Sequence, residues 1–193
     1  MNRVGTPLSD SAAEPAWVGE VLRYWFEELT ETLWFNASRA VDDQIHERFL
    51  ELHDELAAGR ILAVTTPRGF LAAVIVLDQF SRNLFRGTPR AYAADPLARR
   101  LASTAINQGY DRDMTIPQKQ FFYLPFQHSE DPQDQVRSLA LFEKLGNESW
   151  TRYALAHKSI IDRFGRFPHR NEILGRQSSA EELAALEEPM GSF

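Results

Sequence analysis

The feature that most constrains the fold is one apolar run near the middle of the chain. Residues 70–77 are all apolar, and the apolar character continues past Asp78 and Gln79 to Phe80. Thr66 and Pro67 precede the run with the pattern of a helix N-cap and a first-turn proline. A helix that is apolar nearly all round must be covered by other elements on every side. We therefore predict a central, buried helix, which falls short of the roughly 18 apolar residues that span a bilayer.

Amphipathic helices are predicted on both sides of this central element. Apolar residues recur at steps of three and four from Trp17 to Leu29 and again from Ser38 to Ala58, where Gly59 ends the second helix. These two helices are expected to pack as an antiparallel pair.

Later helices are marked by their start signals. Asp95-Pro96 and Asp131-Pro132 repeat the start pattern, and Asn147 is predicted to cap a helix that Gly165 ends. A short helix is predicted to begin at Pro117 and to end at Pro125, because proline lacks the N–H that a helix interior needs.

The C-terminal part carries two further local patterns. Two overlapping capping boxes, Ser178 with Glu181 and Ser179 with Glu182, are expected to start a last short helix. The tail ending in Phe193 could pack into the domain or onto a partner protomer.

No segment alternates apolar and polar residues as a strand does, so the predicted fold class is all-α. We expect a flexible N-terminal arm over residues 1–15. Residues 16–193 are expected to form a single domain of seven or more helices packed as antiparallel pairs.

Composition excludes several kinds of function. The net charge of -6 argues against nucleic-acid binding as the main role. The absence of cysteine excludes disulfides, thiolate zinc sites and thiol nucleophiles. The five histidines show no spacing suited to a metal, and the motifs of nucleotide-binding loops and of serine hydrolases are missing, so we expect no metal and no cofactor. Without a signal peptide or a membrane-spanning run, a cytoplasmic protein is expected.

The first candidate site lies where the central helix turns polar. Its residues are Asp78, Gln79, Arg82, Asn83 and Arg86, and their i,i+4 spacing places them in two rows at the C-terminal end of the helix. One interpretation is a structural Asp78–Arg82 ion pair with a cationic helix end. The other is that the arginines hold an anion.

The second candidate site is the segment from Asp162 to Asn171. It places Arg163, Arg166 and Arg170 close together, and clustered arginines suit the capture of a carboxylate or a phosphate. The alternative is a structural network in which Asp162, Glu172 and Asp78 neutralise them.

Three side chains are candidates for proton transfer. His128 and Glu130 share one predicted loop and His169 follows Pro168, although Glu130 could equally favour the dipole of the next helix. His157 lies on an apolar helix stripe and is expected to be a core residue, with a ligand or a general base as the alternative.

Three separated motifs resemble a known family. They are the segments 77–87 (LDQFSRNLFRG), 122–130 (FYLPFQHSE) and 163–171 (RFGRFPHRN), in this order. Together they are similar to the DUF924 family of uncharacterised bacterial proteins over roughly residues 21–193. The resemblance implies an all-helical, tetratricopeptide-like superhelical arrangement and no established activity. Val64 departs from the tryptophan expected there.

Two functions remain open on the sequence. The first is a small-molecule site, binding or enzymatic, in which arginines hold an anion while His128, Glu130 or His169 handle protons. The second is a tetratricopeptide-like adaptor that binds a peptide or protein in a helical groove. Neither the ligand, the reaction nor the oligomeric state follows from the sequence, and we expect no nucleic-acid or membrane partner.

Overall fold

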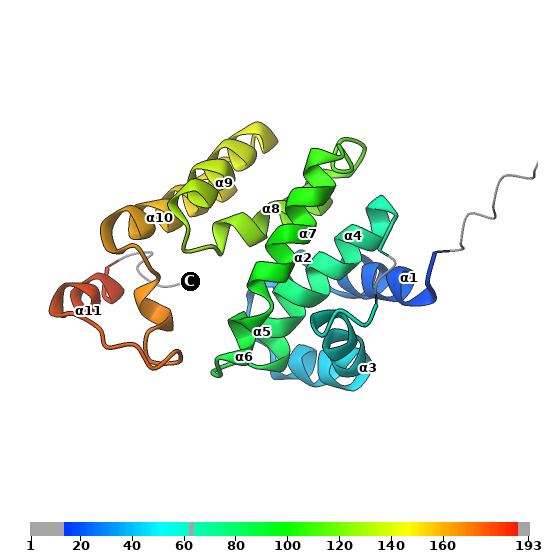
Figure 1. The fold of residues 1–193 in the computed structure, drawn as a ribbon, viewed down its shortest axis with the longest axis horizontal. Helices are drawn as coiled ribbons and strands as arrows, with labels where there is room; N and C mark the ends of the chain where they lie inside the picture. The colour runs from blue at the N-terminus through cyan, green and yellow to red at the C-terminus, as the bar shows by residue number, and fades with distance from the viewer. Residues whose placement is uncertain (1–13, 62–63, 189–193) are drawn as a thin grey trace, which may run out of the picture.

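The computed structural model describes residues 14–61 and 64–188, and this part of the chain consists of helices and loops without a β-strand. Its elements form two groups with α8 (Ile116–Gln127) between them (Figure 1). The N-terminal group contains α1 (Ala16–Arg23), η1 (Tyr24–Glu28), α2 (Glu31–Phe35), α3 (Arg39–Ala57), α4 (Pro67–Val74), η2 (Ile75–Phe80), α5 (Ser81–Leu84), α6 (Arg90–Ala93) and α7 (Asp95–Asn107). The C-terminal group contains α9 (Pro132–Leu145), α10 (Glu148–Phe164), η3 (Pro168–Arg170) and α11 (Ala180–Leu186). The predicted all-α domain with seven or more helices is confirmed.

The central helix is the continuous element formed by α4, η2 and α5. The Thr66 hydroxyl caps its start by accepting a hydrogen bond from the Gly69 amide at 3.0 Å, and Pro67 occupies the first turn. All residues from 69 to 81 are buried, since α1, α3, α7 and α8 surround the helix. η2 is a π-helical turn, which widens the backbone directly at the polar residues Asp78 and Gln79.

The predicted pairing of the first two helices is wrong in its main contact. α3 packs chiefly against η2 and α5, while α1 packs against α4. The first two helices still touch, through the Tyr24–Phe49 ring contact between η1 and α3 and through the Glu20–Arg48 ion pair between α1 and α3. The central helix carries apolar side chains on every side. α1 and α3 therefore bury more apolar surface against the central helix than they would against each other.

The prediction that Pro125 ends its helix is also wrong, because α8 continues through Pro125 to Gln127. Proline inside a helix costs about 3 kcal/mol. The continuation buries Phe126 completely and Gln127 almost completely. Burial of one phenylalanine side chain contributes roughly 2–3 kcal/mol, which offsets most of that cost.

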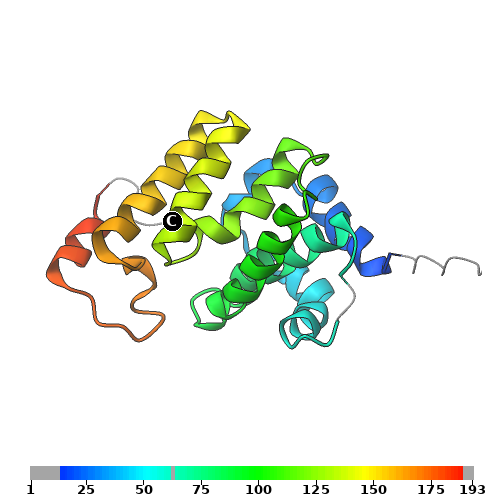
Figure 2. The ribbon, with the colours of Figure 1, turned by 45° about the horizontal axis from the view of Figure 1, so that its top comes forward.

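The helix ends of the C-terminal group follow the sequence signals. The side chains of Asp131 and Asn147 cap α9 and α10, and Gly165 ends α10 in the left-handed conformation. Only one of the two predicted capping boxes forms, that of Ser179 with Glu182. α9 and α10 lie side by side in both ribbon views, and α11 packs near η3 (Figure 2).

No helix in the described ranges is long and apolar enough to cross a membrane. Position 64, where the family resemblance leads one to expect tryptophan, packs its valine against the core. The proposed packing of the tail and most of the predicted N-terminal arm lie outside the described residues.

Candidate functional site

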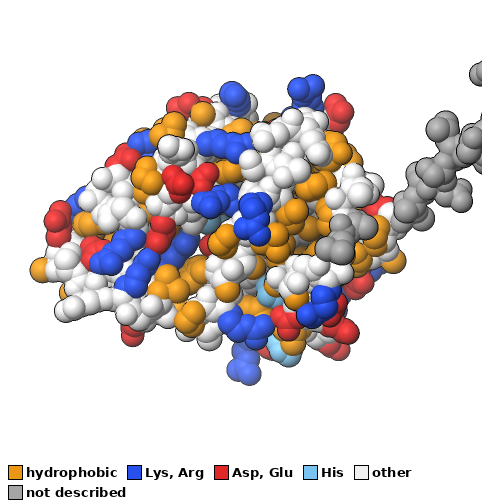
Figure 3. Space-filling view, in the orientation of Figure 1, with side chains coloured by type: hydrophobic (Ala, Val, Ile, Leu, Met, Phe, Trp, Pro, Cys, Tyr) orange, Lys and Arg blue, Asp and Glu red, His pale blue; other side chains and the backbone are white. Residues whose placement is uncertain are grey.

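A cleft of about 660 Å³ lies between the N-terminal and C-terminal groups. Its walls come from α2, η2, α5, α6, α8, α9, α10 and η3 with adjoining loop residues. Basic side chains gather around the hollow on this face of the molecule (Figure 3). Among the described residues no Asp or Glu lines the cleft, whereas three arginines and three histidines do: Arg82, Arg86, Arg170, His128, His157 and His169.

The structure brings most of the predicted site residues to this cleft. Those that line it are Gln79, Arg82, Asn83, Arg86, His128, His169 and Arg170. Asp78 lies directly behind the wall, and Glu130, Arg163 and Arg166 lie elsewhere. The two candidate segments, more than 70 residues apart in the sequence, therefore contribute Arg82 and Arg170 to one site.

Arg82 is held by two acids behind the cleft wall. Its guanidinium lies 3.3 Å from the Asp78 carboxylate and donates two hydrogen bonds to Asp95 at 3.0 and 3.1 Å. Arg170 approaches the same Asp95 at 3.7 Å, and its guanidinium lies over the ring of Tyr92. Burial would lower the pKa of Arg82, but the two acids outweigh burial and raise it.

Arg170 has the opposite electrostatic balance. Burial and the nearby positive charge of Arg82 together lower its pKa, although Asp95 and Glu130 act against them. A buried guanidinium whose surroundings disfavour its charge gains stability from an additional anion.

The outer part of the same wall is organised by Asp42 on α3. Its carboxylate accepts two hydrogen bonds from Arg86, at 2.9 and 3.0 Å, and one from the Asn83 amide at 2.7 Å. These contacts fix the Arg86 side chain at the mouth of the cleft, where it remains about half exposed.

His128 is bonded to the buried Asp78. Its Nδ1 lies 2.9 Å from the Asp78 carboxylate, which the Gln79 amide and Arg82 also contact. Burial would raise the pKa of Asp78, but Arg82 and His128 outweigh burial and hold the pKa below its ordinary value. Burial and Arg82 lower the pKa of His128. At neutral pH the pair therefore consists of a carboxylate and a neutral imidazole.

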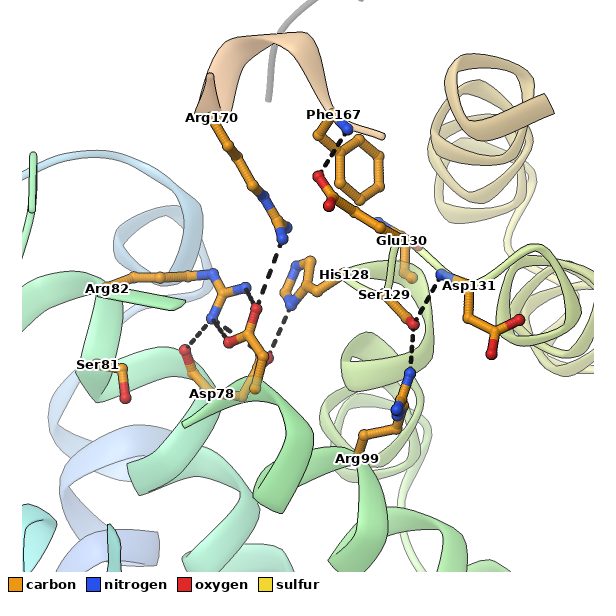
Figure 4. A network of polar contacts seen from close by, with 12 residues as sticks. Asp78, Ser81, Arg82, Arg99, His128, Ser129, Glu130, Asp131, Phe167 and Arg170 are labelled. Carbon is orange, nitrogen blue, oxygen red and sulfur yellow. Dashed lines mark hydrogen bonds and ion pairs between the residues drawn. The ribbon is translucent and has the colours of Figure 1, made fainter. Parts of the chain in front are cut away.

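Glu130 does not line the cleft. It holds the segment from Phe167 to Arg170, which forms the roof of the cleft. The carboxylate accepts a hydrogen bond from the Phe167 amide at 2.8 Å (Figure 4). It also accepts two from Arg176, at 2.8 and 2.9 Å. This contact ties the loop after α8 to the segment that leads into η3, and so holds Arg170 over the cleft.

Arg163 and Arg166 are engaged with acids of the C-terminal segment. Arg163 pairs with Glu181 and Glu188, while Arg166 forms a double hydrogen bond with the buried Glu182. The hydrogen bond from Arg166 lowers the pKa of Glu182 to about 2. These arginines join α10 and the segment before η3 to α11. They are paired with acids, but with Glu181, Glu182 and Glu188 in place of the Asp162, Glu172 and Asp78 that the structural interpretation named.

Sequence reasoning missed several residues of the cleft. Among the missed residues are Trp34, Phe35, Tyr92, Gln120, Gln127, Ser149, Trp150 and Tyr153. Trp150, Tyr153 and His157 share one face of α10, and this face was interpreted as a core stripe. His157 is indeed buried, and its Nδ1 contacts the Tyr153 carbonyl at 2.8 Å, yet it also lines the cleft.

Two buried glutamines were the available signal for the wall formed by α8. Gln120 and Gln127 flank the apolar run of residues 121–126, and both are more than nine-tenths buried. Buried polar side chains in an apolar helix indicate a site or a network rather than core packing. No group of three or more His, Asp or Glu side chains that could bind a metal is found within residues 14–61 and 64–188.

Comparisons with known proteins point in one direction. Residues 21–190 match the model of a family described as a bacterial protein of unknown function, DUF924. A solved structure of a protein of unknown function from Agrobacterium tumefaciens is 41% identical, covers 90% of this chain and 98% of that one, and superposes with a TM-score of 0.85. No curated protein matches the chain.

Proposed function

The chain belongs to the DUF924 family of bacterial proteins, and from the geometry of its cleft we propose that it binds a small organic anion there. The observation that carries this proposal is the distribution of charge. Arginines and histidines line the cleft, while the acids that balance them, Asp42, Asp78 and Asp95, lie behind its walls. A carboxylate or a phosphate entering the cleft therefore meets donors without meeting like charge.

The arginines keep donors available although they are paired. A guanidinium has five N–H donors. Asp42 takes two from Arg86, and Asp95 with the Asp78 carbonyl engages only the two terminal nitrogens of Arg82. The acids therefore orient the guanidinium groups but leave some of their N–H donors without a partner acid. These remaining donors can form a bidentate contact with an anion.

Size and burial favour a small molecule over a peptide. Volumes of 300–1,000 Å³ are typical of small-molecule sites, and the cleft falls within this range at about 660 Å³. Several of its polar side chains are almost completely buried, among them Gln79, Gln120, Gln127 and Arg170. A peptide laid along an exposed groove would reach few of these groups. The tetratricopeptide-like arrangement and the cytoplasmic location expected from the sequence remain part of the proposal.

Binding of simple anions tests the proposal. We expect calorimetry with inorganic phosphate, citrate and ribose 5-phosphate to show one saturable site for at least one of them. Arg86→Gln should weaken that binding about tenfold, because a charge-assisted hydrogen bond contributes roughly 1.5 kcal/mol.

Arg163→Gln is the matched control, since Arg163 is similarly exposed and paired with acids but lies away from the cleft. Its affinity for the same anion should stay at the wild-type value. The proposal fails when none of the three anions binds, or when both substitutions weaken binding equally.

A further inference from the structure

The cleft wall contains a carboxylate–imidazole pair, Asp78 and His128, in the geometry of a general acid–base pair. Asp78 is 1% exposed and belongs to η2, while His128 follows the last residue of α8. Residues from two separate elements of the fold are thus joined by a 2.9 Å contact between the Asp78 carboxylate and His128 Nδ1. Figure 4 shows the pair between Arg82 on one side and Arg170 above it.

The contact fixes where the imidazole carries its proton. An ionised carboxylate can only accept hydrogen bonds, and Asp78 already receives the Gln79 amide and lies beside Arg82. His128 must therefore donate through Nδ1, which leaves the lone pair on Nε2. The side chain of His128 is 15% exposed and lines the cleft. Within the described residues, the ring nitrogen of His128 that makes a hydrogen bond is Nδ1.

A neutral histidine oriented by a buried carboxylate is the arrangement that general-base catalysis requires. Arg82 and Arg170 flank it and can stabilise negative charge that develops on a substrate oxygen. The chain has no cysteine, and no lysine from the described residues lines the cleft. The hydroxyls of Tyr92, Ser149 and Tyr153 also line the cleft, and we assign water, the smallest nucleophile that can enter it, as the one that this base activates.

We propose that His128 is the general base of a hydrolase site whose substrates are carboxylic esters that carry a second, anionic group. Nε2 takes a proton from water while the water oxygen bonds to the ester carbonyl carbon. The carbonyl electron pair moves to its oxygen beside the arginines. When the carbonyl re-forms, the ester C–O bond breaks and the departing oxygen takes the proton from Nε2. Ester and water thus yield acid and alcohol, and His128 is neutral again.

This inference rests on the proposed anion site, and Asp78 acts in it as a positioning residue. Loss of its negative charge should lower the pKa of His128 further and release the ring orientation, so that kcat falls while KM changes little. The pH profile reflects every charged or titratable group around His128: Asp78 and Arg82 from η2 and α5, Asp95 from α7, His157 from α10, and His169 and Arg170 from η3.

The first experiment needs no substrate. ¹⁵N NMR of histidine-labelled wild-type protein at pH 7.5 should show His128 neutral with the proton on Nδ1. Exposed His46 should show the mixture of tautomers expected in water and serves as the internal control. A protonated ring, or a proton on Nε2, would overturn the proposal.

The second experiment measures hydrolysis of mono-4-nitrophenyl succinate and of the neutral 4-nitrophenyl acetate. We expect saturable hydrolysis of the anionic ester and little of the neutral one. His128→Gln should lower kcat about 10²- to 10⁴-fold, the usual contribution of a general base. Asp78→Asn should lower kcat and move the acidic limb of the pH profile to lower pH, and His46→Gln should change nothing.

The two proposals fail separately. When the wild-type protein and His128→Gln both bind citrate or phosphate but neither hydrolyses the anionic ester faster than buffer, the catalytic inference is overturned and the anion site stands. When no anion binds at all, the proposed function fails.

Discussion

Buried histidines determine how the site responds to acid. Burial is the main cause that lowers the pKa of His128, His157 and His169, and for His169 it does so to about 4 with help from the charge of Arg170. Each ring is therefore neutral at pH 7. A histidine with the ordinary pKa of about 6.5 is still partly protonated at that pH. The free energy of unfolding decreases when the pH falls, because these histidines bind protons in the unfolded chain at a pH where they stay neutral in the folded one.

We predict that the protein loses stability as the pH falls from about 6.5 towards 4. A histidine with a lowered pKa contributes its full stability above the unfolded value of 6.5. That contribution decreases below 6.5, by about 3 kcal/mol for a shift of the size found at His169. Urea unfolding at pH 7.5, 6 and 5 should show a shallower decline for His169→Gln than for the wild type. Equal slopes in the two proteins would contradict the prediction.

Elements of this chain begin and end where local chemistry directs them. Thr66, Asp131, Asn147 and Ser179 each use a side-chain oxygen to accept a backbone amide at a helix start. Gly165 ends α10 with a φ of 68°, so the chain can turn towards η3 and carry Arg170 back over the cleft. Helix termini here position functional side chains as well as closing helices.

Replacing Gly165 by alanine should destabilise the fold by about 1–2 kcal/mol, since the left-handed conformation costs a residue with a Cβ that much. A Cβ at this position meets no atom within 4 Å, so the effect is conformational and not a clash. Gly19→Ala is the matched control: it lies in α1, also in open space, and should stabilise by up to about 1 kcal/mol. Chemical denaturation of both variants measures the difference, and a destabilisation of the same size in both would refute the conformational explanation.

At the scale of the whole molecule, the site exists because two groups of helices meet around α8. The N-terminal group supplies Arg82 and Arg86, the C-terminal group supplies Arg170, and His128 lies at the junction. The Glu130 contacts to Phe167 and Arg176 hold the junction closed on one side. This clamp, together with the contacts of Arg170 to Asp95 and Tyr92, sets the position of Arg170 over the cleft.

Breaking the clamp should loosen the roof without unfolding the rest. In Arg176→Gln we expect amide exchange of residues 166–177 to accelerate roughly tenfold, since the loss of a charge-assisted hydrogen bond costs about 1.5 kcal/mol. Exchange in α3 and α4 should stay unchanged. Arg60→Gln breaks an exposed pair with Glu55 on α3 and is the control. Uniform acceleration along the chain would show that the clamp belongs to the global core.

The sequence determined the elements of this protein by itself. Apolar periodicity, caps and terminal glycines depend on residues a few positions apart, so the central helix and the start of α10 could be predicted from them. The motifs around Arg82, His128 and Arg170 were also recognisable, because polar residues at the ends of apolar helices are unusual without a role.

Only the tertiary structure decided which of these residues form one site. Arg163 and Arg170 belong to the same arginine cluster in the sequence, yet Arg163 pairs with acids near α11 and Arg170 covers the cleft. Pro125 remains within α8 because distant packing offsets its local cost. In each case the deciding free energy comes from contacts between residues far apart in the chain, and a local pattern cannot contain that information.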